Sequence, residues 1–271
     1  MTQAEQRAAF TTVADGVHRI SEAYVNFYLV ESSDGLTLVD SGLPASWKTL
    51  DDSIRGLGHS VDDIAALVLT HAHFDHLGLA HRLHTEYGVP VWVHGGDSYI
   101  ARHPYRYRHE KSRFVFALAH PGGLPVLAGM AKAGALRVRG VDELKLFPAD
   151  AGGAGGVGAA GVGAAEGAAL PVPGSPEVVF SPGHTAGHCG LYLRDRDVLF
   201  SGDALVTLDP YTGRTGPRIV AGAATMDSRQ NLDTLTQLAQ TGASLVLPGH
   251  GEPWTGGIGE AVEAARREAA T

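Results

Sequence analysis

Three histidines and one aspartate stand within six residues of the chain, in the segment THAHFDH. Imidazole nitrogens and carboxylate oxygens are common ligands of Zn²⁺ in proteins. His71 and His73 are two residues apart, so an extended segment points both rings to the same side. Asp75 and His76 are shifted along the turn, towards a second cation. Because the chain holds 14 histidines, a histidine-rich polar turn is the alternative interpretation of this segment.

Three later segments share the format of the first one. In each, a short strand-forming run leads into a turn that carries a potential ligand: EVVFSPGH ends at His184, DVLFSGD at Asp203 and SLVLPGH at His250. Loops at the ends of strands are where α/β folds place chemistry, so we expect the four turns to meet at one edge. A chance cluster would leave the three later matches unexplained, and the sequence therefore favours a metal site.

The seven candidate ligands divide between two cations. The first ion would take three imidazole nitrogens at about 2.0–2.1 Å, from His71, His73 and His184. The second would be held by Asp75, His76 and His250. Asp203 lies on a separate loop and could bridge both ions and offset their charge. An open position for water would remain, as in catalytic sites and unlike structural zinc sites.

The elements that must position these residues alternate between strands and helices. Strand-forming runs are expected at 17–32, 35–42, 65–70, 89–94, 177–180, 191–194, 197–200 and 244–247, and helices at 43–56, 77–88, 227–240 and 259–270. This alternation predicts an α/β fold in one domain, residues 1–271. A helical insertion is expected at about 98–148, and a flexible Gly/Ala loop at about 151–169.

Composition limits the classes of partner. The formal net charge of −8 argues against a nucleic-acid partner, because only one short stretch, residues 102–113, is rich in Arg and Lys. The single cysteine, Cys189, excludes an internal disulfide and a multi-cysteine zinc site, and we expect it to be a small buried hydrophobe. No apolar run has the length of a signal peptide or membrane span, so a cytoplasmic protein without a membrane partner is expected.

The four motifs together resemble the metallo-β-lactamase superfamily. Its H-x-H-x-D-H signature matches His71 to His76, and its later metal motifs match GHTAGH, SGD and PGHG in order. The upstream LTLVDSG is similar to the family's early strand and turn, so the resemblance covers roughly 17–254. It implies an αββα sandwich with a dinuclear site at the sheet edge, holding two Zn²⁺, with Fe or Mn as alternative metals. The ligand assignment given above is also the one that the resemblance implies.

The resemblance further implies a hydrolase. A hydroxide bridging the ions would attack the carbonyl of a small ester, thioester or lactone, with Asp75 orienting it. The bridging Asp203 favours the glyoxalase II-like and lactonase-like branch over true β-lactamases. Quorum-lactone hydrolases of the best-known type carry a tyrosine where this chain has Val206. β-Lactam hydrolysis and a mononuclear iron persulfide dioxygenase stay open as alternatives.

Residues around the ligands have weaker assignments. Asp40, in VDSG, is expected either to orient a ligating imidazole or to cap a turn, and His188 either to bond backbone or to contact substrate. Aromatic residues of 98–126 either line a substrate pocket or pack within the insertion, and packing is favoured. The partner is a small-molecule substrate, and the oligomeric state, a homodimer among the possibilities, is left open.

Overall fold

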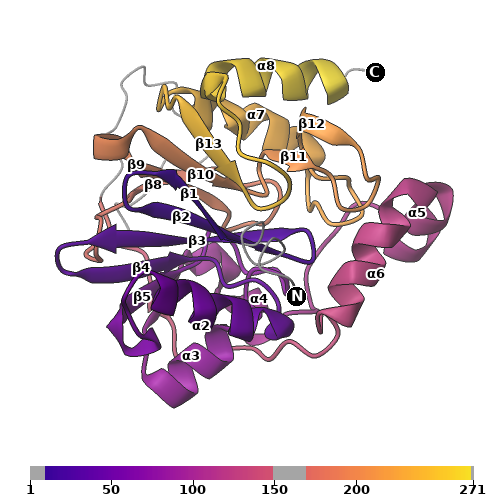
Figure 1. The fold of residues 1–271 in the computed structure, drawn as a ribbon. Coiled ribbons are helices and arrows are strands. Elements are labelled where there is room, and N and C mark those ends of the chain that lie inside the picture. The colour runs from indigo at the N-terminus through magenta and orange to yellow at the C-terminus, as the bar shows by residue number, and fades with distance from the viewer. Residues whose placement is uncertain (1–9, 149–168, 270–271) are drawn as a thin grey trace.

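The computed structural model describes residues 10–148 and 169–269, which form four layers (Figure 1). Helices lie on the outer faces of two β-sheets that stack against each other, so the expected αββα sandwich is confirmed. The first sheet has seven strands in chain order: β1 (Phe10–Ala14), β2 (Val17–Glu22), β3 (Val25–Ser32), β4 (Gly35–Val39), β5 (Ile64–Val68), β6 (Val91–Val93) and β7 (Lys145–Leu146).

The second sheet has four strands in the order β13-β10-β9-β8. Their bounds are β8 (Glu177–Phe180), β9 (Cys189–Leu193), β10 (Val198–Gly202) and β13 (Leu245–Pro248). A separate hairpin joins β11 (Val206–Leu208) to β12 (Thr215–Arg218). Helices α2 (Trp47–Gly56) and α3 (Ala80–Tyr87) cover the first sheet, and α7 (Ser228–Ala239) and α8 (Gly257–Ala269) cover the second.

Strand direction brings the candidate ligands to one edge. Strands β4, β5 and β6 are parallel. In the second sheet β10 is parallel to β13, and two antiparallel pairings through β9 make β8 run the same way as β10. The turns that follow these strands therefore leave each sheet at one end, where loops from different strands can share a site.

The core follows the two-residue period of strand β3. Phe27 and Leu29 point towards the apolar cluster under α2 and α3, while Tyr28 and Val30 point between the sheets. There the ring of Tyr28 meets that of Phe200 at 5.2 Å between centroids. A third cluster packs β10 and β13 against α7 and α8. Each sheet is thus buried on both faces, which explains the near-continuous apolar runs of its central strands.

The segment that follows β6 contains three short helices. They are α4 (Ser98–Arg102), α5 (Arg113–Ala119) and α6 (Leu124–Lys132), and the chain then rejoins the first sheet at β7. The two-residue β7 and the hairpin β11–β12 are not among the strands expected from sequence. The Gly/Ala segment at 151–169 lies outside the described residues, except for Ala169, which forms a bridge with Glu177.

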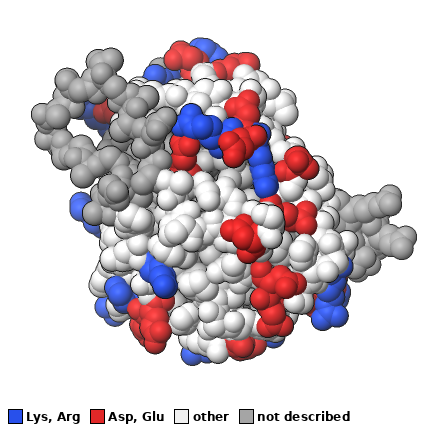
Figure 2. Space-filling model, turned by 90° about the vertical axis from the view of Figure 1, so that its left-hand side faces the viewer, with Lys and Arg blue, Asp and Glu red and all other residues white. Residues whose placement is uncertain are grey.

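Two surface features bear on the expected partners. Within the described residues no single helix has the length and apolarity to cross a membrane; α5 and residues 121–132 pass that test only as a pair bent by 101°. On the face shown in Figure 2, acidic and basic side chains are interspersed among uncharged ones.

Candidate metal centre

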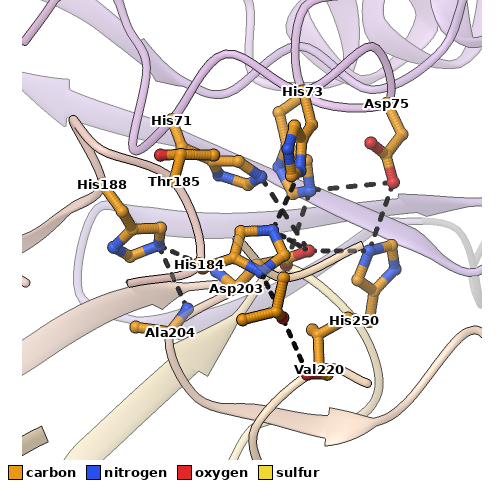
Figure 3. A network of polar contacts seen from close by, with 12 residues as sticks. His71, His73, Asp75, His184, Thr185, His188, Asp203, Ala204, Val220 and His250 are labelled. Atoms are coloured by element: carbon orange, nitrogen blue, oxygen red, sulfur yellow. Dashed lines mark hydrogen bonds and ion pairs between the residues drawn. The ribbon is translucent and has the colours of Figure 1, made fainter. Parts of the chain in front are cut away.

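The seven candidate ligands converge at the edge where the two sheets meet (Figure 3). Four of them follow β5, and one each follows β8, β10 and β13. All seven residues are buried, none more than 6% exposed. Their donor atoms form three mutually close groups, within 4.8 Å in each: His71, His73 and His184; His71, His76 and Asp203; Asp75, His76 and His250.

Asp203 lies at the centre of the cluster. Its Oδ2 is 3.5 Å from Nε2 of His184 and 3.3 Å from Nε2 of His250, and its Oδ1 is 3.5 Å from Nε2 of His76. Asp75 lies on one side only, 3.3 Å from Nε2 of His250. The carboxylate of Asp203 therefore contacts both halves of the donor set, as expected of a bridging ligand.

Four imidazoles are held from behind by their Nδ1 atoms. Nδ1 of His76 donates to Oδ2 of Asp40 at 2.9 Å, and Nδ1 of His250 donates to the carbonyl of Tyr24 at 2.7 Å. Nδ1 of His184 faces the Thr225 hydroxyl at 3.2 Å. That hydroxyl donates to a carbonyl and so has a lone pair left for the ring.

The fourth ring, His71, repeats this arrangement with Thr70. The Thr70 hydroxyl is 3.1 Å from Nδ1 of His71 and itself donates to Asp40. These partners favour a proton on Nδ1 of each ring and leave Nε2 directed to the centre as the atom that could bind a cation. The His73 ring has the opposite orientation: its Nδ1 points to the centre and lies 2.9 Å from Nε2 of His184.

Several inward atoms have no hydrogen-bond partner within the described residues. They are Nε2 of His71, His76 and His250, and Oδ1 of Asp203. Buried polar atoms are nearly always satisfied, and an orphaned one calls for an explanation such as an ion. A set of imidazole and carboxylate donors around one space fits Zn²⁺, and also Fe or Mn.

The pKa values of these groups reflect burial and two buried carboxylates. Burial lowers the pKa of His71 and His73 well below 6.5, and that of His184 to about 4. Burial also acts on His250, but Asp203 and Asp75 outweigh it and raise its pKa to about 10. His71, His73 and His184 are therefore neutral, the state that a cation requires of imidazole ligands. Carboxylates outweigh burial and raise the pKa of His76 as well, so His76 and His250 each hold a proton that a bound cation would replace.

Two glycines allow the loops to approach so closely. Gly202 has φ +50°, and a Cβ there would lie 2.6 Å from Nε2 of His188 and 2.7 Å from the Thr70 hydroxyl. A Cβ at Gly249 would lie 2.2 Å from Oδ1 of Asp203. The SGD and PGH turns therefore need glycine where it stands.

Asp40 and His188 surround the ligand cluster. Asp40 accepts from the His76 ring, as described, and from the backbone N–H of Thr70 at 2.8 Å. Nε2 of His188 accepts from the backbone N–H groups of Asp203 and Ala204, both at 3.1 Å. His188 thus holds the SGD turn through backbone, and burial lowers the pKa of its ring to about 3.

The remaining histidines bond elsewhere. Ring nitrogens of these residues meet backbone carbonyls, a backbone N–H or the Glu31 carboxylate: His18, His59, His81, His84, His94, His103, His109 and His120. Cys189 is buried, in line with a small hydrophobe, and burial raises the pKa of its thiol.

One organising residue has no motif in the sequence. The buried carboxylate of Asp97 accepts from the N–H of Ala72 at 3.0 Å, the Thr185 hydroxyl at 2.7 Å and the N–H of Gly187 at 2.7 Å. It therefore ties the loop of the first two histidines to the loop of His184. Only its place just after strand β6, at the same edge, could have indicated this role.

Comparison with known proteins agrees with this architecture. The family model described as "Metallo-beta-lactamase superfamily" matches residues 21–250. The probable metallo-hydrolase YflN of Bacillus subtilis (strain 168) is 25% identical over 94% of this chain and 91% of its own length. Hydroxyacylglutathione hydrolase GloC of Haemophilus influenzae is 28% identical, over 53% of this chain and 50% of its own.

Solved structures share the fold. The metallo-beta-lactamase family protein TTHA1429 from Thermus thermophilus has a TM-score of 0.63 at 24% identity, covering 96% of this chain and 81% of that one. TTHA1623 in a di-iron-bound form has a TM-score of 0.56 at 23% identity, covering 91% and 96%. The family model matches most of this chain, including all the residues that build the site. The chain therefore belongs to the metallo-beta-lactamase superfamily.

Proposed function

We propose that this protein is a zinc-dependent hydrolase that holds two cations and hydrolyses a small ester, thioester or lactone by attack of water on the carbonyl carbon. The observation that carries the proposal is the set of seven buried donors around one space, four of which direct an unpartnered atom into it. When bound, a pair of divalent cations lowers the pKa of water to about 7 and stabilises negative charge on a substrate oxygen.

The chain's own residues prepare the site for this reaction. His71, His73 and His184 would hold one cation, and Asp203 lies where it can contact both. The Asp75 carboxylate borders the same space and is suited to orient the attacking water and accept its proton. The hydrogen bonds to Nδ1 of the rings keep the lone pairs of Nε2 directed inward, so little rearrangement is needed on loading.

The relatives support assignment to the hydrolases, but they do not indicate one particular substrate. GloC is a named hydroxyacylglutathione hydrolase, but it matches only half of this chain. Structures of β-lactamases share the fold at 16–18% identity, and a likeness at that level indicates the fold but not the substrate. The di-iron neighbour keeps iron open as the native metal, so the metal must be measured. A small-molecule partner and a cytoplasmic location stay predictions from sequence.

Metal content and hydrolysis test the proposal together. We expect two divalent cations per chain by elemental analysis, and hydrolysis of at least one member of a panel of lactones, esters, thioesters and β-lactams. His71→Ala and Asp203→Ala should each lose metal and activity. His103→Ala is the matched control, because that exposed ring lies outside the ligand cluster and its Nδ1 bonds the Tyr99 carbonyl. One iron per chain with oxygen consumption, or hydrolysis that survives both substitutions, would refute the zinc-hydrolase assignment.

A further inference from the structure

A pocket opens beside the metal centre and is largely apolar. Its lining consists of the candidate ligands His73, Asp75, Asp203 and His250 together with Phe74, Tyr107, Leu127, Met130, Pro210, Tyr211, Val220 and Ala224. Among the described residues that line it there is no Lys or Arg. Apart from the candidate ligands, the walls therefore carry no charged side chain, and they suit uncharged, apolar groups of a substrate.

Tyr211 lines this pocket from a turn that is fixed by hydrogen bonds and close packing. The Asp209 carboxylate accepts from the N–H of Tyr211 at 3.1 Å and from the Thr212 hydroxyl at 2.7 Å. The turn packs so closely on Gly123 that a Cβ there would lie 2.1 Å from the Tyr211 carbonyl. With its backbone held on two sides, Tyr211 is only 8% exposed.

Tyr107 stands next to it and contacts the metal centre directly. The centroid of its ring is 4.0 Å from that of His73. The Arg113 guanidinium lies 4.2 Å from the centroid of the Tyr107 ring. A side-chain hydrogen bond links the phenols of Tyr107 and Tyr211. Burial raises the pKa of both phenols, that of Tyr211 to about 12, so both hydroxyls keep their protons at neutral pH. When the Tyr107 hydroxyl donates to that of Tyr211, the Tyr211 proton is left for a ligand in the pocket.

We propose that Tyr211 contacts the substrate and donates a hydrogen bond to the leaving-group oxygen of a neutral oxygen ester or lactone. This inference rests on the proposed function and narrows its substrate class. Cations polarise a carbonyl oxygen, so the scissile group has one other acceptor, the leaving atom. Oxygen accepts a hydrogen bond well, whereas thioether-type sulfur is a weak acceptor. A phenol in an apolar pocket therefore favours oxygen esters over thioesters.

The reaction is balanced without any oxidant or further reactant. The oxygen of water forms a bond to the carbonyl carbon, and the bond from that carbon to the leaving oxygen breaks. One proton of the water ends on the leaving oxygen, which becomes an alcohol, while the acyl group becomes a carboxylic acid. Tyr211 is unchanged throughout, and its hydrogen bond is strongest while the leaving oxygen carries negative charge.

A matched lactone and thiolactone test this assignment. The metal-loaded full chain and its Tyr211→Phe variant are assayed on γ-butyrolactone and γ-thiobutyrolactone by the release of acid. We expect the variant to lose at least tenfold in kcat/KM on the lactone, about the effect of one donor to a developing charge, and less than threefold on the thiolactone. Two metal ions per chain should remain. Tyr99→Phe, at an exposed ring outside the pocket lining, is the control and should change neither.

Each other result overturns the proposal in a recognisable way. An equal loss on both substrates would place the hydroxyl on the carbonyl side or in a structural role, and no loss would remove it from the reaction. If Tyr211→Phe loses its metal, the Tyr107→Phe variant is assayed on the same two substrates. A loss of kcat/KM on the lactone but not on the thiolactone in that variant would assign the hydrogen bond to Tyr107 and overturn the proposal. A wild-type chain that cleaves thioesters but no lactone or ester would overturn this inference and leave the proposed function standing.

Discussion

Asp40 is the residue whose replacement tests most directly how the metal centre is held. It directly follows strand β4 and has a left-handed φ of 57°. Its Oδ1 accepts from the N–H of Thr70, and its Oδ2 accepts from the Thr70 hydroxyl and from Nδ1 of His76. Asp40→Asn keeps the shape and replaces one acceptor by a donor. Asn is also among the residues that tolerate the left-handed region.

The amide can satisfy only part of this arrangement. With its oxygen on the Thr70 N–H, its NH₂ group faces Nδ1 of His76. The ring then moves its proton to Nε2 and accepts from the amide, and Nε2 can no longer bind a cation. Metal binding forces the proton back to Nδ1, where it meets a donor, or turns the amide so that the Thr70 N–H is unpaired.

The expected loss of metal affinity follows from the contact between two donors at Nδ1 of His76. A buried donor without an acceptor costs about 1–3 kcal/mol, so affinity for the cation at His76 should fall about 10- to 100-fold, the usual effect of losing such an outer partner. In the metal-free variant His76 also loses the charge of Asp40, one of the carboxylates that raise its pKa. Once neutral, the ring avoids the conflict by changing tautomer, so the free energy of unfolding should fall by less than it does in Asp40→Ala. Asp40→Ala should instead destabilise the metal-free protein by about 3 kcal/mol, because the Thr70 N–H is left unpaired in either state.

Chelator competition gives the metal affinities, and urea unfolding of the metal-free proteins gives the stabilities. Asp227→Asn is a matched control, since Asp227 caps α7 through the N–H of Gln230 and Asn caps a helix equally well. Unchanged metal affinity in Asp40→Asn would refute the tautomer argument. A large loss of metal-free stability in that variant would show that Asp40 acts through folding instead.

Three further predictions concern stability. Gly202→Ala should lower the free energy of unfolding by about 2–4 kcal/mol, because its Cβ meets His188 at a positive φ; Gly58→Ala, also at positive φ but with open space, should cost only about 1 kcal/mol by urea unfolding. Burial opposes ionisation of Glu31, but His18 outweighs it and lowers the pKa of Glu31 below 4.5. The stability that wild type has over Glu31→Gln should therefore be present above pH 4.5 and vanish as the pH falls through the lowered pKa; a difference that persists in acid would refute this. Removal of metal by a chelator should lower the Tm reversibly, by the equivalent of about 4 kcal/mol for a cation at 1,000 times its Kd, and an unchanged Tm would exclude a tightly bound ion.

The central strands and large helices could be predicted because their signals are local. Strand β5 is an apolar run that leads into the ligand turn, and α7 has apolar residues at helical spacing after Asp227, a good N-cap. The hairpin β11–β12 gave no such signal: its strands are three and four residues long, and the second, TGPR, holds a glycine and a proline. Tertiary contacts decide such elements.

The candidate ligands could be named from sequence because each stands in a short motif at the end of a strand. The residues that orient them could be predicted only in part. Asp40 lies in a recognisable turn, whereas the bond from His250 to the Tyr24 carbonyl joins residues 226 positions apart. Tyr107 was expected to pack within the insertion, while the structure places it on the His73 ring as part of the pocket. Such contacts depend on how the loops meet in three dimensions.

The burial of the centre links its chemistry to the stability of the fold. Seven ionisable side chains without cations leave buried atoms unpartnered, and each such atom costs about 1–3 kcal/mol. Their outer partners, such as Asp40 and Thr225, keep the rings in place, so the metal-free fold must bear this cost instead of relaxing it. Cation binding removes the cost and adds charge attraction to Asp203, whose pKa His250 and His76 already hold well below its usual value against the effect of burial. A site that is rigid before loading has little reorganisation left for the reaction, so the same outer hydrogen bonds that reduce metal-free stability should favour catalysis.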